Sequence, residues 1–223
     1  MNTTPGKLIS FEGGEAVGKT TQVQRFCDRL QAEFPDRKIV RLREPGGTPA
    51  SEHLRKLIKF DLLFAERSLE TELFLFLAAR ADLVPKVVRP ALAEGAFVVS
   101  DRFIDSTVVY QGFVSGLPVD RLQMLNDMAT GGLRPDLTVL LQVTDEVAKS
   151  RLMNADRERG CHFEKKPASY HQAVRNGYLR LAQENPDRVR LIDGSRSQDE
   201  VAADIWASFI EKITGTPLPQ SST

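Results

Sequence analysis

A glycine-rich segment that ends in a lysine and a threonine has the strongest chemical signal in this sequence. Its pattern, G-x-x-x-x-G-K-[ST], is typical of a P-loop, whose backbone N–H groups surround phosphate oxygens. The segment follows the apolar run Leu8–Phe11 and precedes a stretch of helical periodicity, so a bound phosphate would also lie at a helix N-terminus. The alternative is a glycine-rich turn with an unrelated lysine. The residues predicted to bind nucleotide phosphates are Gly13, Gly14, Glu15, Ala16, Val17, Gly18, Lys19, Thr20 and Thr21.

Five side chains, in the P-loop and after two of the apolar runs, would supply this phosphate chemistry. Within the P-loop, Lys19 would reach the β and γ phosphates, and the Thr20 hydroxyl would bind Mg²⁺. Asp101 and Arg102 follow the apolar run Phe97–Val99, where a carboxylate could also hold Mg²⁺ and an arginine could bind a phosphate. An Asp-Arg pair after a strand could equally be a surface ion pair. Arg43 likewise ends an apolar run and precedes a Pro-Gly-Gly turn.

The elements that must position these residues alternate between strands and helices. Strands are predicted for short runs rich in β-branched residues, at 7–12, 39–43, 97–100, 137–143 and 189–192. Helical periodicity covers 18–33, 49–59, 66–93, 118–129, 145–154, 168–184 and 198–213, and Pro85 and Pro90 should divide the third of these segments after Val84. The signal at 104–117 is mixed. Alternating strands and helices predict an α/β fold with a parallel sheet covered on both faces.

Composition excludes several classes of protein. The chain has 223 residues, of which 41% are apolar and 27% charged, as in an ordinary globular domain. Lys plus Arg and Asp plus Glu both number 30, which argues against a nucleic-acid-binding protein. No apolar run is long enough for a membrane helix, and residues 1–6 are too short and polar for a secretory signal. Cys27 and Cys161 are far apart and match no metal or redox spacing. A cytoplasmic location is therefore expected.

One segment has no clear core face. Residues 150–167 are highly charged and contain Gly160 and Pro167, which suits a solvated surface loop or a lid bearing arginines. A single domain is predicted over residues 1–213, with the lid at about 150–167. The tail, residues 214–223, is predicted to be disordered.

Four motifs occur in one order between about residues 7 and 185. They are Phe11-Glu12-Gly13 with Gly18-Lys19-Thr20-Thr21, then Arg43–Thr48, then Asp101–Thr107 with Tyr110-Gln111-Gly112, and finally Arg134–Thr138. In this combination the sequence resembles the bacterial thymidylate kinase (dTMP kinase) family. The resemblance implies the P-loop nucleoside monophosphate kinase fold, with a five-stranded parallel sheet flanked by helices, a lid, and usually a homodimer. It also implies transfer of the γ-phosphate of ATP to dTMP, with Mg²⁺, in dTTP biosynthesis.

The resemblance implies roles for residues that bind the acceptor. Phe76 matches a phenylalanine that stacks on thymine, although without the resemblance it would be interpreted as a core aromatic. Arg80 matches an arginine that contacts the base, and Arg43 and Arg102 match the arginines that hold the acceptor phosphate. The matching positions near the base and the sugar are Glu15, Ser106, Thr107, Tyr110 and Gln111.

The resemblance also implies where the catalytic arginine lies. Some family members have an arginine in the P-loop at the position of Ala16, and others supply arginines from the lid. The catalytic residues predicted here are Lys19, Arg102, Arg151, Arg157 and Arg159. Two positions depart from the family pattern: His162 stands where the lid usually has an arginine, and Gln142 stands where an aspartate is common.

Two other functions are consistent with these motifs. A deoxynucleoside kinase would share the P-loop, but its hydroxyl acceptor would require a carboxylate base rather than a pair of arginines. A nucleotide-binding module without activity would use ATP only to order the lid. Neither alternative requires thymidylate as a substrate.

Overall fold

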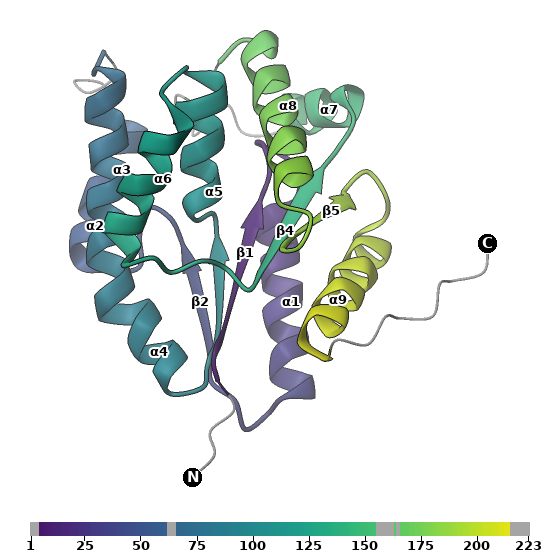
Figure 1. Cartoon of the computed structure of the whole chain (residues 1–223). Coiled ribbons are helices and arrows are strands. Elements are labelled where there is room, and N and C mark those ends of the chain that lie inside the picture. The colour runs from purple at the N-terminus through teal and green to yellow at the C-terminus, as the bar shows by residue number, and fades with distance from the viewer. Residues whose placement is uncertain (1–4, 62–65, 155–162, 164–165, 215–223) are drawn as a thin grey trace.

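Five parallel strands form the central sheet, as the sequence predicts. The computed structural model describes residues 5–61, 66–154, 163 and 166–214. The strand order is β2-β3-β1-β4-β5, which places β1 at the centre (Figure 1). The ends of the strands differ from the prediction by at most one residue. Their bounds are β1 Lys7–Glu12, β2 Ile39–Arg43, β3 Phe97–Asp101, β4 Leu137–Gln142 and β5 Val189–Asp193.

The register of the sheet brings the chemical motifs together. In β1, Phe11 is paired with Asp101 of β3, and Asp101 is in turn the partner of Arg43 in β2. The carboxyl ends of these three neighbouring strands therefore lie at one edge of the sheet, where ligands bind in open parallel sheets. The P-loop leaves the same edge, directly after Glu12.

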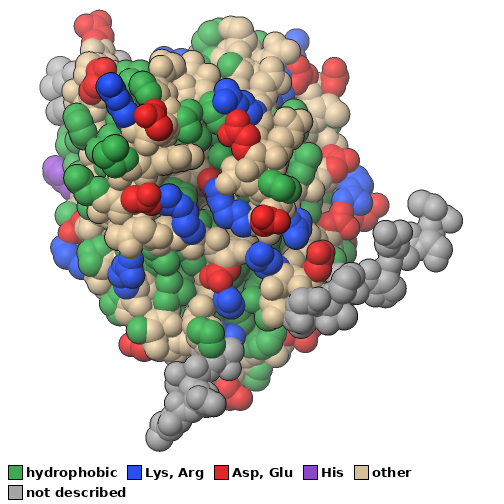
Figure 2. Space-filling model, in the orientation of Figure 1, with side chains coloured by type: hydrophobic (Ala, Val, Ile, Leu, Met, Phe, Trp, Pro, Cys, Tyr) green, Lys and Arg blue, Asp and Glu red, His purple; other side chains and the backbone are tan. Residues whose placement is uncertain are grey.

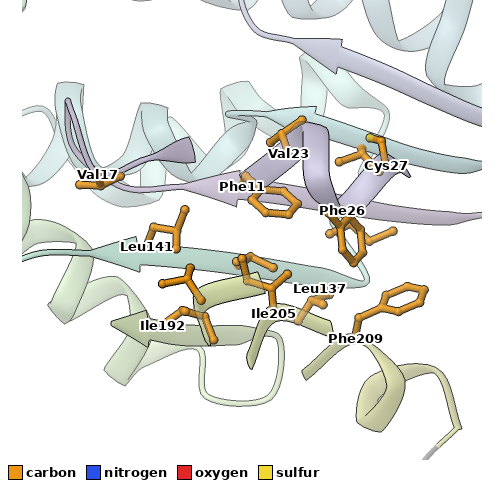
Figure 3. Close-up of a cluster of buried hydrophobic side chains, with 14 of the residues drawn as sticks. Phe11, Val17, Val23, Phe26, Cys27, Leu137, Leu141, Ile192, Ile205 and Phe209 are labelled. Carbon is orange, nitrogen blue, oxygen red and sulfur yellow. The ribbon is translucent and has the colours of Figure 1, made fainter. Parts of the chain in front are cut away.

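One face of the sheet packs against α1 (Lys19–Glu33) and α9 (Gln198–Thr214). Alternate residues of the strands, such as Phe11 and Leu141, point into this layer and meet Phe26 of α1 and Phe209 of α9 (Figure 3). The phenylalanine rings of Phe26 and Phe209 lie edge to face, with centroids 5.2 Å apart. This apolar layer fixes the direction in which α1 leaves the P-loop.

The other face is covered by two groups of helices (Figure 1). The π-helical segment η2 (Val84–Val88) and helix α4 (Arg89–Ala93) pack on β2 and β3. Helix α8 (Ala168–Glu184) and the π-helical segment η3 (Val108–Val114) pack on β4 and β5. The three inner strands, β1, β3 and β4, are thus buried on both faces, which explains their apolar runs, whereas the edge strands β2 and β5 are partly exposed. The other helices in the described part of the chain are α2 Pro49–Phe60, α3 Leu69–Leu83, α5 Ile104–Thr107, α6 Val119–Thr130 and α7 Asp145–Asn154.

Two helical segments change their winding. The predicted helix 66–93 begins at Leu69, is α-helical to Leu83, then widens to η2 (Val84–Val88) and ends as α4 (Arg89–Ala93). Pro85 lacks an N–H group, so the change after Leu83 agrees with the division expected from the prolines. In the segment with a mixed signal, α5 continues as the π-helical η3 (Val108–Val114).

One departure from the family pattern has a structural explanation. The Gln142 side chain donates a hydrogen bond of 2.9 Å from Nε2 to the backbone oxygen of Arg175 in α8. An aspartate could not donate this bond. No helix in the described part of the chain is long and apolar enough to cross a membrane.

Candidate active site

The P-loop backbone has the conformation that its glycines allow. Gly13 and Gly18 have φ values of 132° and 96°, where other residues are strained. A Cβ atom on Gly13 would lie 2.3 Å from the backbone oxygen of Leu141, so packing also requires glycine there. The Lys19 ammonium group turns back over the loop and donates hydrogen bonds to the carbonyl oxygens of Gly13 and Gly14.

Lys19 is buried, with 9% of the residue exposed. Burial lowers its pKa to about 8, and the neighbouring Arg102 acts in the same direction, whereas the carboxylates of Asp101 and Glu15 oppose the shift. The group is therefore a cation at neutral pH that is poorly solvated in the absence of a ligand. A phosphate oxygen would give this ammonium group an anionic hydrogen-bond partner, which is strongly favourable for a buried cation.

Thr20 and Asp101 are brought together by the pairing of β1 with β3. The Thr20 hydroxyl donates to Asp101 Oδ2 over 3.3 Å. A hydroxyl and a carboxylate are oxygen ligands that suit Mg²⁺, which commonly binds one or two protein groups together with phosphate oxygens and water. Among the described residues, no group of three or more His, Cys, Asp or Glu could hold a metal ion by itself. The two residues therefore fit a metal ion that arrives with a nucleotide.

A cavity of about 630 Å³ lies next to these groups. The nine residues that the resemblance assigns to the acceptor all line it, together with Ala16, Lys19, Thr20 and Asp101. By contrast, the Val17 side chain lies in the hydrophobic core, and Thr21 is exposed and does not line the cavity. The nine acceptor-site residues are Glu15, Arg43, Phe76, Arg80, Arg102, Ser106, Thr107, Tyr110 and Gln111.

Arg102 occupies a strained position at the floor of the cavity. Its φ is 72°, which a residue with a side chain rarely adopts. The guanidinium Nη1 donates to Ser106 Oγ at 3.2 Å and to Tyr178 Oη at 3.1 Å. It also lies 5.0 Å from the centre of the Tyr110 ring. This set of contacts holds the cation at the end of β3, within the cavity.

Arg80 is held by protein groups on every side. The residue is 2% exposed, and its Nε donates to Glu44 Oε2 at 2.8 Å. Its Nη1 donates to Thr107 and to Asn126 at 2.9 and 2.6 Å, and its Nη2 donates to the backbone oxygen of Phe103 at 3.0 Å. Nη2 also lies 2.7 Å from Glu44 Oε2. These contacts engage the whole guanidinium group and tie α3, α5 and α6 around the cavity.

Aromatic rings form one wall. The Phe76 ring centre lies 6.4 Å from that of Phe163, which in turn lies 6.4 Å from that of Tyr110. Gln111 is buried nearby and donates a hydrogen bond from Nε2 to Glu72 at 3.0 Å. Phe76 is half-buried in this wall, where it packs against the small hydrophobic cluster of Ile58 and Phe163 and also lines the cavity.

A histidine that the sequence analysis missed contacts the P-loop. His171 Nδ1, from α8, lies 3.6 Å from Glu15 Oε2, and the Tyr110 hydroxyl donates to Glu15 Oε1 at 2.8 Å. Burial alone would raise the pKa of Glu15, but His171 and Arg102 together lower it to about 2. Glu15 in turn raises the pKa of His171. The signal in the sequence was the seven-residue spacing of His171 and Tyr178 on one helix, which directs both toward the sheet.

A second missed residue is Glu12, at the end of β1. It is fully buried and accepts hydrogen bonds from Phe103 N at 2.7 Å, Ser106 Oγ at 2.6 Å and Tyr178 Oη at 2.8 Å. Burial, together with the nearby Asp105 carboxylate, raises the pKa of Glu12 to about 7. The sequence analysis included Glu12 in the Phe11-Glu12-Gly13 motif but gave it no role, and the signal for one was a carboxylate at the end of a strand, directly before the P-loop.

Of the predicted lid arginines, Arg151 belongs to the described part of the chain. From α7 it donates hydrogen bonds to the backbone oxygen of Ala16 at 3.4 Å and of Gly194 at 3.0 Å. It therefore reaches the P-loop at the position where some relatives have an arginine in the loop itself. Arg157, Arg159 and His162 lie outside the described residues.

A parallel five-stranded sheet with a P-loop after its central strand and an arginine-lined cavity at the strand ends defines a P-loop nucleoside monophosphate kinase fold. The family model for thymidylate kinase matches residues 11–205. This chain belongs to the thymidylate kinase family, which confirms the predicted fold and the predicted activity of an ATP-dependent phosphotransferase.

Individual relatives cover nearly the whole chain. The thymidylate kinase of Symbiobacterium thermophilum is 46% identical over 198 residues, which are 89% of this chain and 90% of that protein. The enzyme of Chromohalobacter salexigens is 44% identical over 94% of this chain and 98% of its own length. A crystal structure of thymidylate kinase from Ehrlichia chaffeensis has a TM-score of 0.74 at 28% identity, covering 92% of this chain and 99% of that one.

Proposed function

We propose that this chain transfers the γ-phosphoryl group of ATP to the phosphate of thymidylate, giving ADP and dTDP. One observation carries the proposal: a single cavity is lined by the P-loop lysine, Lys19, and by two arginines, Arg43 and Arg102. A lysine for the phosphates of the donor and a pair of arginines for the phosphate of the acceptor suit a reaction in which both substrates carry phosphate. The thymidylate kinases to which the chain is similar support thymidylate as the acceptor.

The donor nucleotide would bind at the P-loop. Backbone N–H groups of the loop and the N-terminus of α1 would surround its phosphates, and Lys19 would neutralise charge between the β and γ positions. Thr20 and Asp101 are the residues that would hold Mg²⁺, whose role when bound is to neutralise charge on the transferred phosphoryl group. Their 3.3 Å separation is close enough for both to serve one ion, directly or through water.

The acceptor phosphate would lie between Arg43 and Arg102. Such a phosphate is already anionic at neutral pH, so no general base is required. The properties of Glu15 are consistent with this, because a carboxyl group whose pKa is about 2 is a poor base. A deoxynucleoside kinase, which must take a proton from a hydroxyl group, is the weaker alternative for this reason.

The thymine base would lie against the aromatic wall. Phe76 lines the cavity, and stacking of a base on an aromatic ring is favourable whatever the base. Arg80 would contact the base by sharing an N–H group that already binds a protein oxygen. Ser106, Thr107, Tyr110 and Gln111 would surround the base and the 2′ position of the sugar, and the Glu15 carboxylate would lie near the 3′-hydroxyl group.

The transferring phosphoryl group needs one more cation, which we assign to Arg151, Arg157 or Arg159. Arg151 is supported by its contact with the backbone of Ala16, because that contact brings a guanidinium group to the P-loop. An arginine supplied in this way stabilises the charge that spreads over the phosphoryl oxygens during transfer. Residues 150–167 would then act as the lid that excludes water.

We also propose that the protein works as a cytoplasmic homodimer without nucleic-acid or membrane partners. Phe74 of α3 and Met124 and Met128 of α6 expose 57%, 68% and 75% of their surface on neighbouring helices, which a second copy could cover.

Lys and Arg side chains are interspersed with Asp and Glu on the face shown in Figure 2, as expected for a protein that does not bind a polyanion. The buried free thiol of Cys27 suits a reducing compartment.

An assay of ADP release with a panel of acceptors tests the activity. Thymidylate, deoxyuridylate, the other monophosphates and thymidine would each be incubated with the protein and Mg-ATP. Thymidylate should give the highest kcat/KM. A preference for thymidine would establish a deoxynucleoside kinase, and ATP binding without turnover of any acceptor would establish a binding module.

A further inference from the structure

We infer that Glu12 is a positioning residue for Arg102, which acts by orienting the two hydroxyl groups that hold the Arg102 guanidinium. The inference rests on the role proposed above for Arg102 in binding the acceptor phosphate. Glu12 itself lies beneath the cavity wall and does not line it. Its influence on the substrate would therefore be exerted through Ser106 and Tyr178.

The two oxygens of the Glu12 carboxylate have different partners. Oε1 accepts the backbone N–H of Phe103, the residue after Arg102, over 2.7 Å. Oε2 accepts both hydroxyl groups, from Ser106 at 2.6 Å and from Tyr178 at 2.8 Å. The carboxylate thus binds the backbone next to the strained Arg102 residue and the two side chains that contact its guanidinium.

The direction of these hydrogen bonds decides whether the Arg102 guanidinium faces lone pairs or protons of the two hydroxyl groups. Each hydroxyl group has a single proton, and an ionised carboxylate can only accept, so both protons point at Glu12. The lone pairs of Ser106 Oγ and Tyr178 Oη are then left for Arg102 Nη1, which donates to them over 3.2 and 3.1 Å. If Oε2 became a donor to one hydroxyl, that hydroxyl would turn its own proton away from Glu12. The proton would then point toward the guanidinium, which cannot accept it, or toward the other hydroxyl, 3.0 Å away, and in either case a lone pair available to Arg102 would be lost.

This arrangement depends on the charge of Glu12, and several groups face it. Asp105 of α5 and burial favour the neutral form, while Arg102 and the hydroxyl groups of Ser106 and Tyr178 favour the anion. Lys19 of α1 lies close enough to interact with it. The charge of Asp105 is itself balanced by Arg188, with contacts of 2.6 Å to both carboxylate oxygens. Because the pKa of Glu12 is raised to about 7, the anion becomes the main form only above that pH.

The test is the isosteric change Glu12→Gln in the full chain. Its amide oxygen can still accept from Phe103 N, but its NH₂ group would face the two hydroxyls as a donor. The KM for thymidylate should rise about 10-fold or more, because hydrogen bonds to a charged group are lost, while the KM for ATP stays within about 2-fold. The matched control is Asp136→Asn at the opposite end of β1, where the carboxylate accepts from Leu8 N, and both KM values should be unchanged.

The pH profile separates positioning from general damage to the fold. As the pH falls below about 7, the thymidylate KM of the wild type should rise relative to that of Glu12→Gln, whose side chain does not titrate. The ratio of the two values cancels the titration of the thymidylate phosphate, whose pKa is about 6. A constant ratio, or an equal loss for both substrates, would overturn the inference.

A second variant keeps the test decisive if Glu12→Gln does not fold. Tyr178→Phe removes one of the two oriented hydroxyls and should raise the thymidylate KM in the same direction by a smaller factor. Unchanged KM values in this variant would contradict the inference. An inactive wild type assayed in parallel would instead overturn the proposed function, so the two failures can be told apart.

Discussion

Arg102 Nη2 lies 3.2 Å from Glu15 Oε1, which joins the end of β3 to the P-loop by a partly buried ion pair. The exposed fractions of the two side chains are 20% and 11%, so neither is fully hydrated. A phosphate that binds Arg102 would compete with this carboxylate for the guanidinium N–H groups. The pair therefore couples the acceptor side of the cavity to the loop that would bind the donor.

The first prediction concerns this arginine. Arg102→Ala should raise the KM for thymidylate by a factor of about 10² or more while changing ATP affinity little, because a bound phosphate loses a paired cation. Steady-state kinetics and ATP titrations measure the two effects. Arg102→Lys keeps the charge but not the forked geometry and should recover only part of the loss. Equal weakening of both substrates would make Arg102 a structural residue.

Lys19 should take up a proton when ATP binds at alkaline pH. Its pKa is lowered to about 8 by burial, so at about pH 8.5 a large fraction of the free protein has a neutral Lys19. Phosphate binding favours the cation, which raises the pKa and draws in a proton. Calorimetric titrations in buffers of different ionisation enthalpy should reveal this uptake at pH 8.5 and much less of it at pH 7.

Lys19→Arg is the control for that measurement, since arginine stays charged and should bind ATP without proton uptake. Uptake that persists in this variant would assign the titration to another group. Lys19→Ala should in addition reduce turnover by about 10² or more in a folded protein.

The lid arginines should respond unequally to mutation. Of the single changes Arg151→Ala, Arg157→Ala and Arg159→Ala, one should reduce kcat by about 10³ with little effect on ATP affinity, as expected for an arginine finger. The contact of Arg151 with the P-loop makes it the first variant to measure. If all three remain within a few-fold of the wild type and His162→Ala fails, the histidine is the cation, and turnover should fall as pH rises through about 6–7.

His171 should stabilise the fold more at acidic than at alkaline pH. Glu15 raises its pKa, so the stabilisation from the His171 cation is fully present below the unfolded value of about 6.5 and is lost as pH rises through the folded pKa. His171→Asn should therefore lower the free energy of unfolding by about 1 kcal/mol more at pH 6 than at pH 9. Urea denaturation at the two pH values measures the difference, and a pH-independent cost would contradict the pairing.

The proposed dimer can be tested on α6. Met124→Glu combined with Met128→Glu puts two charges on the exposed apolar surface and should convert a dimer to a monomer. Analytical ultracentrifugation measures the mass. Leu191→Glu is the matched control. Leu191 on β5 is an exposed apolar residue as well, with 51% of its surface accessible, but it lies on a different part of the surface. Dissociation by both variants, or by neither, would argue against an interface at α6.

The sequence predicted the elements of this fold better than the details of its site. The strands were found within one residue because each is a short run rich in apolar residues between turns and helical segments, and the P-loop showed at which end of the strands the site lies. The segment at 104–117 stayed ambiguous because its widened helical turns match neither a strand nor a regular helix. The partners of Glu12 lie 94 and 166 residues away in the chain, a relationship that no local spacing encodes.

The central place of β1 in the sheet also bears on how the chain folds. Its neighbours come late in the sequence, since Lys7 pairs with Phe97 and Ile9 with Leu137. One edge of the strand that carries the P-loop therefore stays open until β3 has been made, and the other until β4, which lies beyond the middle of the chain, has followed. Such non-local parallel pairing is slow to form. The capacity to bind nucleotide should accordingly arise late in folding, and ATP would stabilise only molecules in which the middle of the sheet is complete.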